Sequence, residues 1–468
     1  MRKISYKQYL LTVLMVILAS NLVDRVALGV LLQDIKIDLD LSDTQLGFLT
    51  GIAFALFYSV MGLPIARWAD RGNRVTIITV TTVLWSTTVA LCGFAANFAQ
   101  LLLIRVGVAV GEAGCIPPAH SLIADYYTRA DRPRAIGRYM LGYPLSAVLG
   151  YFLAGWLNEL YGWRVTFLLL ALPGLGLAAL AWFTFREPRT GRASDADGIR
   201  EAVRLSASSA LDGPTPHPSV RDVCVTLWNN VTFRHLLLSW SVMSFFGWGV
   251  AQWKPAFFIR SYGLDTGEVG TWFAVTYGLA GFVGTYWGGE LASRCAARNE
   301  RLQLKAMAVA FAFFAVISAG IYVSSSPFWA FVLMGLSLLG VYTTYGPLFA
   351  TIQTLVPPRM RASALATVYL FANLIGLGLG PLAAGALSDA LRLRFGEESL
   401  RYALLAMCPG YLWAAWHLYW GSRTIDGDLQ SLQQSGDPSD AVDGHGDSHR
   451  ADALNVRRVV SLKEAEGG

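Results

Sequence analysis

The sequence carries little charge for its length. Of its 468 residues only 15% are charged, while 54% are hydrophobic and the mean hydropathy is +0.44. A soluble chain of this size needs a larger charged surface, so the composition excludes an ordinary water-soluble fold and is typical of a multi-pass membrane protein. The net charge of +5 does not indicate a nucleic-acid partner, because the arginines lie in short connections between apolar segments.

Cysteine is also scarce, and its few positions are far apart. The five are Cys92, Cys115, Cys224, Cys295 and Cys408, without any C-x-x-C pair. This scatter argues against a zinc site, a redox motif or a disulfide framework, so we expect no metal. The phosphate-binding pattern G-x-x-x-x-G-K-[ST] is missing as well. We therefore expect no nucleotide, no other cofactor and no enzyme activity.

Long apolar segments are abundant, and they fall into two groups of six. Those of the first group lie at about 8–32, 45–66, 75–96, 98–126, 135–158 and 162–185. Those of the second lie at about 233–259, 266–292, 303–325, 327–355, 362–390 and 400–421. About 20 apolar residues span a bilayer as a helix. The pattern predicts an all-α integral membrane protein with twelve transmembrane helices in two six-helix pseudo-repeats.

The polar stretches set the expected domain boundaries. We predict an N-terminal bundle over 1–185, a cytoplasmic linker over 186–230, a C-terminal bundle over 231–422 and a disordered cytoplasmic tail over 423–468. The linker is expected to end in a short surface helix around 219–229. Both histidines of the tail are dispersed, which is a poor pattern for a metal site.

Basic residues alternate between the loops. They concentrate in the loops around 67–74, 129–138, 294–305 and 359–361, and the intervening loops hold few until the last, with Arg392, Arg394 and Arg401. Lys and Arg favour the cytoplasmic side of a membrane. We therefore expect both termini in the cytoplasm, in a multi-pass protein of the bacterial inner membrane that is a monomer.

The fourth apolar segment contains two opposite charges. Arg105 and Glu112 lie seven residues apart, about two helical turns, so they share one face at different depths. Ionisable side chains at membrane depth cost several kcal/mol, about 2.5–3.5 on insertion scales, and usually have a partner or a function. Gly107 and Gly111 between them form a G-x-x-x-G patch that lets a neighbouring helix approach closely.

The first segment supplies further polar groups at a matching depth. Asn21, Asp24 and Arg25 lie in the outer half of that helix, level with Arg105 of the fourth, while Glu112 lies about 10 Å deeper. We expect Asp24, Arg25 and Arg105 to form one cluster. No basic residue shares the depth of Glu112 on its own helix. Burial penalises a charged carboxylate that has no fixed partner, so Glu112 is the first candidate proton carrier and Asp24 the second.

Two interpretations of this cluster remain open. In the functional one, Arg105 and Arg25 hold an anionic group of the substrate. In the structural one, the charges pin two helices together as a salt bridge.

The second half contributes mainly uncharged candidates for substrate binding. Trp248, Tyr342, Tyr345 and Asn373 would line an apolar, aromatic wall, and His120 of the first half is added to this set. Aromatic residues in membrane helices are more often packing, and His120 has the same alternative. Lys254 is the one cation of the inner second-half helices, and its alternative role is to extend its ammonium group to the outer surface.

A motif after the second segment resembles the signature of the major facilitator superfamily. The residues Gly62, Asp70, Arg71, Gly72 and Arg74 lie in a run that resembles the pattern G-x(7)-D-R-x-G-R. The resemblance implies a twelve-helix transporter in which these residues form a conformational latch. In that latch Asp70 would face the N-terminus of the eleventh helix near Arg361, where negative charge is favoured.

Finer features are similar to the spinster-like branch of that superfamily. They include Asp24-Arg25, the Arg105 to Glu112 spacing, Pro117-Pro118-Ala119-His120, Gly162-Trp163-Arg164 and the run from Asn373 to Pro381. Membership of this branch implies transport of lysophospholipid- or sphingolipid-like molecules, coupled to protons through the acids of helices one and four.

The sequence thus predicts a proton-coupled secondary active transporter of an amphipathic organic molecule, working by rocker-switch alternating access. The partners are the substrate, protons and the lipid bilayer. The first alternative is a proton-coupled symporter of small organic anions, such as a sugar acid or an aromatic acid. The second is a membrane receptor that binds without transporting.

Overall fold

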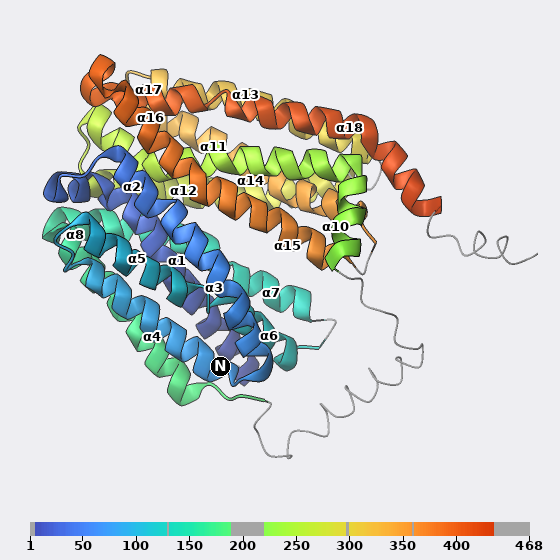
Figure 1. The fold of residues 1–468 in the computed structure, drawn as a ribbon, viewed down its shortest axis with the longest axis horizontal. Coiled ribbons are helices and arrows are strands. Elements are labelled where there is room, and N and C mark those ends of the chain that lie inside the picture. Colours follow the sequence, from blue (N-terminus) through green and yellow to red (C-terminus); the bar gives the residue numbers. More distant parts are fainter. Residues whose placement is uncertain (1–4, 129–130, 189–219, 296–298, 358–359, 435–468) are drawn as a thin grey trace, which may run out of the picture.

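The computed structural model describes residues 5–128, 131–188, 220–295, 299–357 and 360–434, and these are almost entirely helical. The helices of the first half and those of the second half form two adjacent groups (Figure 1). Most of the predicted linker and the residues after 434 lie outside the described residues.

The first repeat comprises six rods, several of which are broken. Its helices are α1 (Tyr6–Leu39), α2 (Asp43–Thr50), α3 (Ile52–Arg71), α4 (Arg74–Cys92), α5 (Phe98–Glu112), α6 (Ile116–Tyr126), α7 (Arg132–Met140) and α8 (Gly142–Thr184). The pairs α2–α3, α5–α6 and α7 with the first part of α8 each make one rod.

The second repeat follows a short helix, α10 (Val220–Asn229), which matches the predicted surface helix. Its helices are α11 (Val231–Tyr262), α12 (Thr266–Cys295), α13 (Glu300–Val323), α14 (Pro327–Thr354), α15 (Arg361–Phe371), the π-helix η3 (Ala372–Leu379), α16 (Gly380–Phe395), the 3₁₀ turn η4 (Gly396–Glu398), α17 (Ser399–Met407) and α18 (Gly410–Gln434). The run α15–η3–α16 is the eleventh rod, and α17–α18 is the twelfth.

Length and hydropathy support membrane crossing. Within the described residues eight helical stretches are long and apolar enough to span a membrane, and two of them, Arg134–Thr184 and Ala364–Leu432, each hold two consecutive rods. Together with α11 and α12 they make twelve transmembrane helices in two six-helix repeats, which confirms the predicted fold class.

The expected tail begins later than predicted. We expected polar disorder from residue 423, but α18 continues to Gln434. The extra helical turns are held by tertiary contacts: Ile425 is fully buried, and Asp428 accepts a hydrogen bond from the backbone N–H of Thr232 at 2.7 Å. A polar composition alone did not show these contacts.

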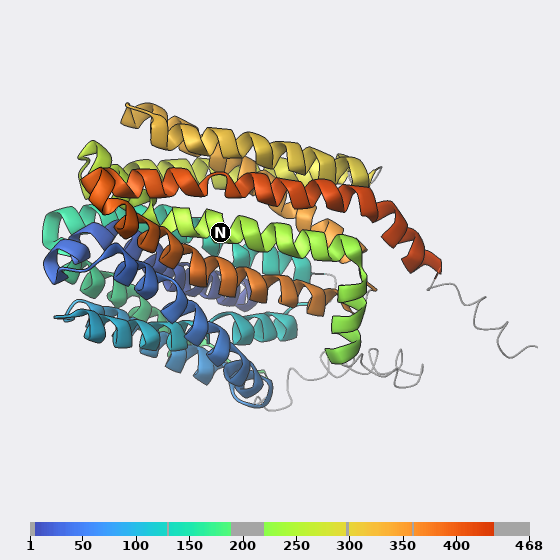
Figure 2. The same ribbon diagram turned by 45° about the horizontal axis from the view of Figure 1, so that its top comes forward.

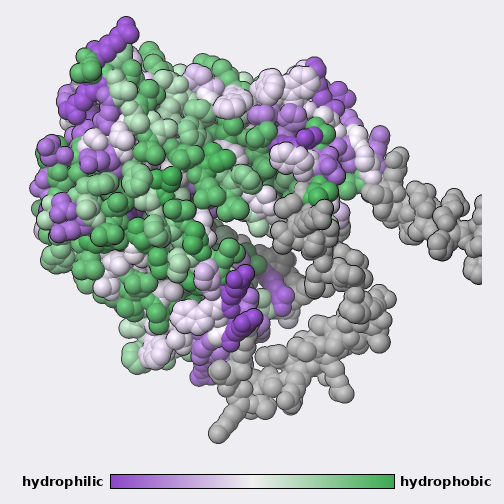
Figure 3. Space-filling model, viewed as in Figure 1, coloured by the Kyte–Doolittle hydropathy of each residue, from purple (hydrophilic) through white to green (hydrophobic). Residues whose placement is uncertain are grey.

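The molecule has two distinct ends. We call the end with the α1–α2 turn the turn end, and the end with the start of α1 and the end of α18 the terminus end (Figures 1 and 2). Hydrophobic side chains cover the middle of the surface, hydrophilic ones gather towards both ends, and the surface is hollowed between the repeats (Figure 3). This distribution is expected for a protein surrounded by a bilayer.

Glycine and proline determine where the rods turn or break. At Gly162, φ is +77° and ψ is 165°, a backbone conformation that is essentially restricted to glycine, and it joins two antiparallel rods inside α8. In the fourth rod, Pro117 and Pro118 lack N–H groups and fit only the first turn of a helix. A new helix therefore starts at Ile116, and Glu112 becomes the last residue of α5.

The G-x-x-x-G patch brings α5 against α4, as predicted. A Cβ at Gly107 would lie 2.9 Å from the side chain of Thr88, and one at Gly111 would lie 2.6 Å from the backbone nitrogen of Trp85. The second clash involves backbone, which cannot swing aside. The spacing between the two helices therefore depends on Gly111, the residue next to Glu112.

We predict that Gly111→Ala lowers the apparent melting temperature of the purified protein in detergent. Overpacking of a tight contact costs about 1–3 kcal/mol, which corresponds to a fall of several degrees. Gly176→Ala is the matched control, because a Cβ there meets no atom within 4 Å. Equal melting temperatures for the two variants would contradict the close α4–α5 contact.

Candidate transport site

One ion pair joins the first and fourth rods of the first repeat. Arg105 on α5 donates from Nη1 to Oδ2 of Asp24 on α1 at 2.8 Å, and both side chains are 2% exposed. The structure therefore confirms that these two residues meet at one depth. A buried pair of this kind is stable when both partners are present, and costly when one is missing.

A second ion pair corrects the expectation for Glu112. Arg25 donates from Nε to Oε2 of Glu112 at 2.5 Å, and the Glu112 side chain is fully buried. We expected no basic partner at this depth, because only residues of the same helix were considered. The Arg25 side chain comes from the neighbouring helix and is long enough to cover the difference in depth.

The four charges therefore form two pairs across α1 and α5, with no net charge. Arg25 differs from the other three because 21% of its side chain is exposed, whereas Asp24, Arg105 and Glu112 are 2% exposed or less. It is thus the most accessible member of the cluster.

Two aromatic residues that sequence reasoning missed hold Arg25 in place. Its guanidinium carbon lies 4.5 Å from the ring centroid of Phe54 and 4.6 Å from that of Tyr58, both on α3. The two rings are stacked at 5.8 Å. Such cation–π contacts favour a fixed cation. Their spacing of four residues, which puts two rings on one helical face, was the available signal.

Several polar atoms around the cluster lack a partner. Among the described residues, Oδ1 of Asp24, Oε1 of Glu112, Nε of Arg105 and Nδ2 of Asn21 are buried without a hydrogen bond. Buried polar groups are normally satisfied, and unsatisfied ones often mark a site for a proton, a water or a ligand. The two free carboxylate oxygens can accept a proton without first breaking an existing hydrogen bond.

His120 lies apart from these pairs on α6. Its ring contacts Tyr139 of α7 edge-on at 5.4 Å between centroids, and its buried Nε2 has no partner in the part of the chain that the structure describes. The ring contact fits the packing alternative, and the free nitrogen leaves the ligand alternative open.

In the second repeat the predicted aromatic residues form a partly connected group. Tyr342 and Tyr345 on α14 lie 5.5 Å apart, and Tyr345 contacts Trp240 at 5.1 Å. Trp248 is 37% exposed on α11. Asn373 lies within the π-helix η3, a distortion that often occurs at functional positions.

Lys254 is not where a cation extending to the outer surface would be. It is only 6% exposed on α11, and among the described residues no carboxylate pairs with it. Its surroundings include Cys408, at the break between α17 and α18. The C-terminal end of α17 carries partial negative charge and offers the ammonium group some compensation.

Arg74 of the motif has buried contacts within its own repeat. Its guanidinium pairs with Glu187 and, at 2.6 Å, with Asp125, and Nη1 donates to the carbonyl oxygen of Ser121 at 3.1 Å. It thus ties the start of α4 to α6 and to the segment after α8. The latch expected of Gly62, Asp70, Arg71 and Gly72 stays a prediction.

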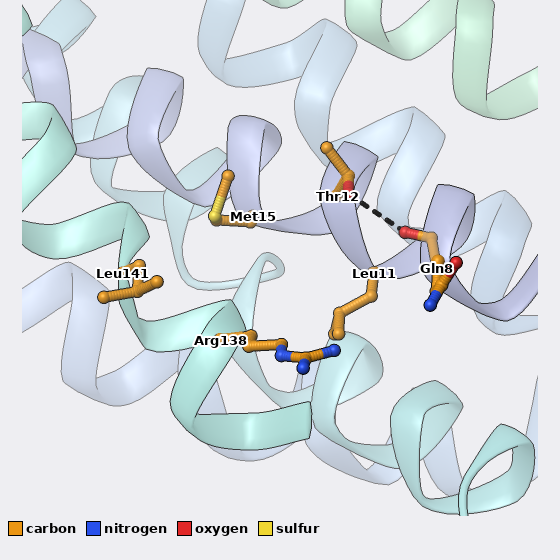
Figure 4. A pocket seen from close by; sticks show the side chains of 6 residues that line it. All are labelled: Gln8, Leu11, Thr12, Met15, Arg138 and Leu141. Atoms are coloured by element: carbon orange, nitrogen blue, oxygen red, sulfur yellow. Dashed lines mark hydrogen bonds between the residues drawn. The ribbon is translucent and has the colours of Figure 1, made fainter. Parts of the chain in front are cut away.

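A pocket of about 410 Å³ opens at the terminus end, between α1 and α7 (Figure 4). Its lining combines one cation with polar and apolar side chains: Gln8, Leu11, Thr12, Met15, Arg138 and Leu141. In Figure 4 the guanidinium of Arg138 extends beneath α1, towards Leu11. The pocket therefore offers one positive group beside apolar surface.

Comparison with known proteins agrees with this architecture. Residues 14–381 match the family model of the Major Facilitator Superfamily. An MFS-type efflux pump of Mycolicibacterium smegmatis is 31% identical over 86% of this chain and 89% of its own length. A probable L-galactonate transporter of Escherichia coli is 24% identical over 82% of each chain.

A solved structure is similar over nearly the whole chain. It is the crystal structure of a bacterial homologue of the human lysosomal transporter spinster, in an inward-facing and unoccupied conformation. The TM-score is 0.78 and the identity 30%, covering 90% of this chain and 98% of that one. The protein therefore belongs to the Major Facilitator Superfamily, as a spinster-like membrane transporter rather than an enzyme.

We predict strong coupling between Asp24 and Arg105. Asp24→Asn or Arg105→Met alone leaves a buried charge unpaired, which costs about 3–5 kcal/mol. The double variant should recover part of this loss, with a coupling of about 0.5–3 kcal/mol. Thermal melts in detergent of the wild type, the two single variants and the double variant measure this coupling.

The exposed pair of Arg164 with Asp38, whose side chains are 40% and 46% exposed, provides the control cycle. Solvent screening should reduce its coupling to about 0–1 kcal/mol. Similar coupling in both cycles would refute the importance of burial at Asp24.

We predict that Lys254→Met raises the apparent melting temperature. The substitution removes a buried cation and keeps a side chain of similar length, a change that is often stabilising by about 1–4 kcal/mol. Lys36→Met is the matched control and should lower the melting temperature, because Lys36 pairs with buried Asp43 at 2.6 Å. A lower melting temperature for Lys254→Met would show that Lys254 has a compensating partner.

Proposed function

We propose that this transporter moves an amphipathic organic anion, of the lysolipid or sphingolipid-like kind, in exchange for or together with protons. The observation that carries the proposal is the Arg25–Glu112 pair, in which an accessible cation is bound to a fully buried acid. An anionic head group that binds Arg25 competes directly with Glu112 for the same guanidinium.

That competition gives a simple coupling mechanism. When the substrate takes Arg25, the Glu112 carboxylate loses its partner in a site where an unpaired charge is unfavourable. Taking up a proton removes the penalty. Asp24 provides a second free carboxylate oxygen in the same cluster, while Arg105 stays bound to it and tunes the site.

The amphipathic character of the substrate is supported by aromatic residues of both repeats, which we propose as the apolar wall of the site. Trp248, Tyr342, Tyr345 and Asn373 present mainly aromatic surface, and Phe54 and Tyr58 flank the cation. The pocket at Arg138 repeats the combination of one cation with apolar side chains, and we propose it as a first contact for the same head group. His120 and Asn21 would line the path between them.

Alternating access fits the two-repeat fold. We propose that the repeats, residues 1–185 and 231–422, rock as units about the substrate, with 186–230 as linker and the residues beyond α18 as tail. We propose that the terminus end, which carries the basic loops, faces the cytoplasm of a bacterial cell, at the inner membrane. The Asp70 motif would then latch the outward-facing state of a monomer.

The competing proposal is uptake of a small organic anion. It is favoured by the similarity to a probable L-galactonate transporter, and the same charges would bind a sugar acid. A receptor that binds without transporting is the third possibility, and transport assays separate it from the other two.

We predict that a pH gradient drives lysophospholipid transport in proteoliposomes of the wild-type protein. Glu112→Gln should keep substrate exchange and lose the response to the gradient. Arg25→Ala should reduce transport at least about tenfold, because a charge-assisted hydrogen bond contributes about 1.5–3 kcal/mol. Glu397→Gln is the control, since that carboxylate is exposed and pairs within its own repeat.

The same assay is run with L-galactonate as cargo. Transport of L-galactonate without the lysophospholipid would replace the proposal by the small-anion alternative. If Glu112→Gln responded to the gradient like the wild type, proton coupling at Glu112 would be wrong. Binding of either probe without movement would favour the receptor.

A further inference from the structure

The turn end is closed by two contacts between the repeats that have the same construction. The first lies between α2 of the first repeat and α16 of the second. The Asp389 carboxylate on α16 accepts hydrogen bonds from the backbone N–H groups of Asp43 at 3.1 Å and Thr44 at 2.7 Å. These N–H groups are in the first turn of α2, where no carbonyl of the same helix can accept them.

The second contact lies between α8 of the first repeat and α12 of the second. The Glu159 carboxylate on α8 accepts a hydrogen bond at 2.8 Å from the backbone N–H of Gly267, in the first turn of α12. Here the carboxylate belongs to the first repeat and the helix start to the second, the reverse of the first contact.

Glycines occupy matching positions in both contacts. The residue four positions before each carboxylate is glycine, Gly385 and Gly155, and a Cβ there would lie under 3 Å from the carbonyl oxygen of Asp43 or Thr266 respectively. Each clash involves the first residue of the opposing helix.

The opposing helices are related in the same way. Gly47 lies four positions after Asp43, and Gly270 lies four positions after Thr266. A Cβ on either would lie under 3 Å from a carbonyl oxygen eight positions before the carboxylate, that of Pro381 or Tyr151. The two contacts therefore match in charge, spacing and backbone approach.

The surrounding side chains are not symmetric. At α2, buried Asp43 accepts from Arg260 at 2.8 Å, from Lys36 at 2.6 Å and from Ser388 at 2.7 Å. At α12, Trp156 donates to Thr271 at 3.0 Å. What the two contacts share is the carboxylate on a helix start and the glycine pair beneath it.

We infer that Asp389 and Glu159 are positioning residues that act as twin latches, holding the turn end closed in one state of the transport cycle. A carboxylate at a helix N-terminus is bound by free N–H groups and by the helix dipole. When the repeats move apart at the turn end, the contacts of Asp389 and Glu159 are lost together. This inference rests on the proposed alternating access, but it concerns the closed state itself and needs no substrate.

The test measures distances between spin labels in the full-length protein, with its five cysteines replaced by alanine. One label at Ile37 and one at Leu393 report across the turn end, since both side chains are exposed, by 69% and 102%. A second pair, Ile37 with Phe94, lies within the first repeat and reports its integrity.

We predict that Asp389→Ala and Glu159→Ala each raise the ratio of open to closed turn ends about fivefold, and that the double variant raises it about 25-fold, because each charge at a helix start contributes independently. Asp389→Asn and Glu159→Gln keep an acceptor oxygen and should therefore change the ratio of open to closed turn ends less. Glu397→Ala, at the same end, should match the wild type. The Ile37–Phe94 distance should stay constant throughout.

Gly155→Val places a bulky side chain in the α8–α12 contact. It should therefore lengthen the Ile37–Leu393 distance by steric clash, without removing a carboxylate. An unchanged Ile37–Leu393 distribution in the double carboxylate variant, beside an opened one in Gly155→Val, overturns the latch. A longer Ile37–Leu393 distance in Glu397→Ala would also overturn the latch. Absence of pH-driven transport in the wild-type protein, while the variants shift the label distances as predicted, would instead count against the proposed function alone.

Discussion

The pairing of charges in a medium without water is the constraint on which the site depends. Two acids and two arginines lie between α1 and α5, and each acid is bound by an arginine of the other helix. Isolated, any one of them would be expensive at this depth. As a neutral set of four they are stable, and in the proposed mechanism a substrate that carries one negative charge replaces one member. The pairing of acids with arginines is thus required for stability and, in the proposed mechanism, for function.

Backbone geometry puts that set in place. The double proline at 117–118 ends α5 at Glu112, and Gly111 brings α5 against α4 close enough that Arg105 and Glu112 are directed towards α1. Phe54 and Tyr58 then hold the Arg25 guanidinium over the acid. Each of these residues acts locally, and together they fix a partly exposed cation beside a buried acid.

The sequence was sufficient for the fold and for the membership of the cluster. Hydropathy identified twelve segments, and depth along each helix brought Asp24 to Arg105. The prediction was wrong where a contact depends on the reach of a side chain, because Glu112 received its partner from another helix. The glycines at 47, 155, 270 and 385 gave no signal in the sequence, because their role depends on the backbone that faces them.

The middle of the molecule and its turn end contribute differently to the proposed transport cycle, the first through charged side chains and the second through backbone contacts. In the proposed cycle, the side-chain pairs in the middle are exchanged for substrate and proton, so they respond to what is bound. At the turn end, carboxylates meet helix starts across a glycine contact, which tolerates no intermediate spacing. A contact of that kind is either made or broken. The site can therefore change its occupancy gradually, while access to it switches between closed and open.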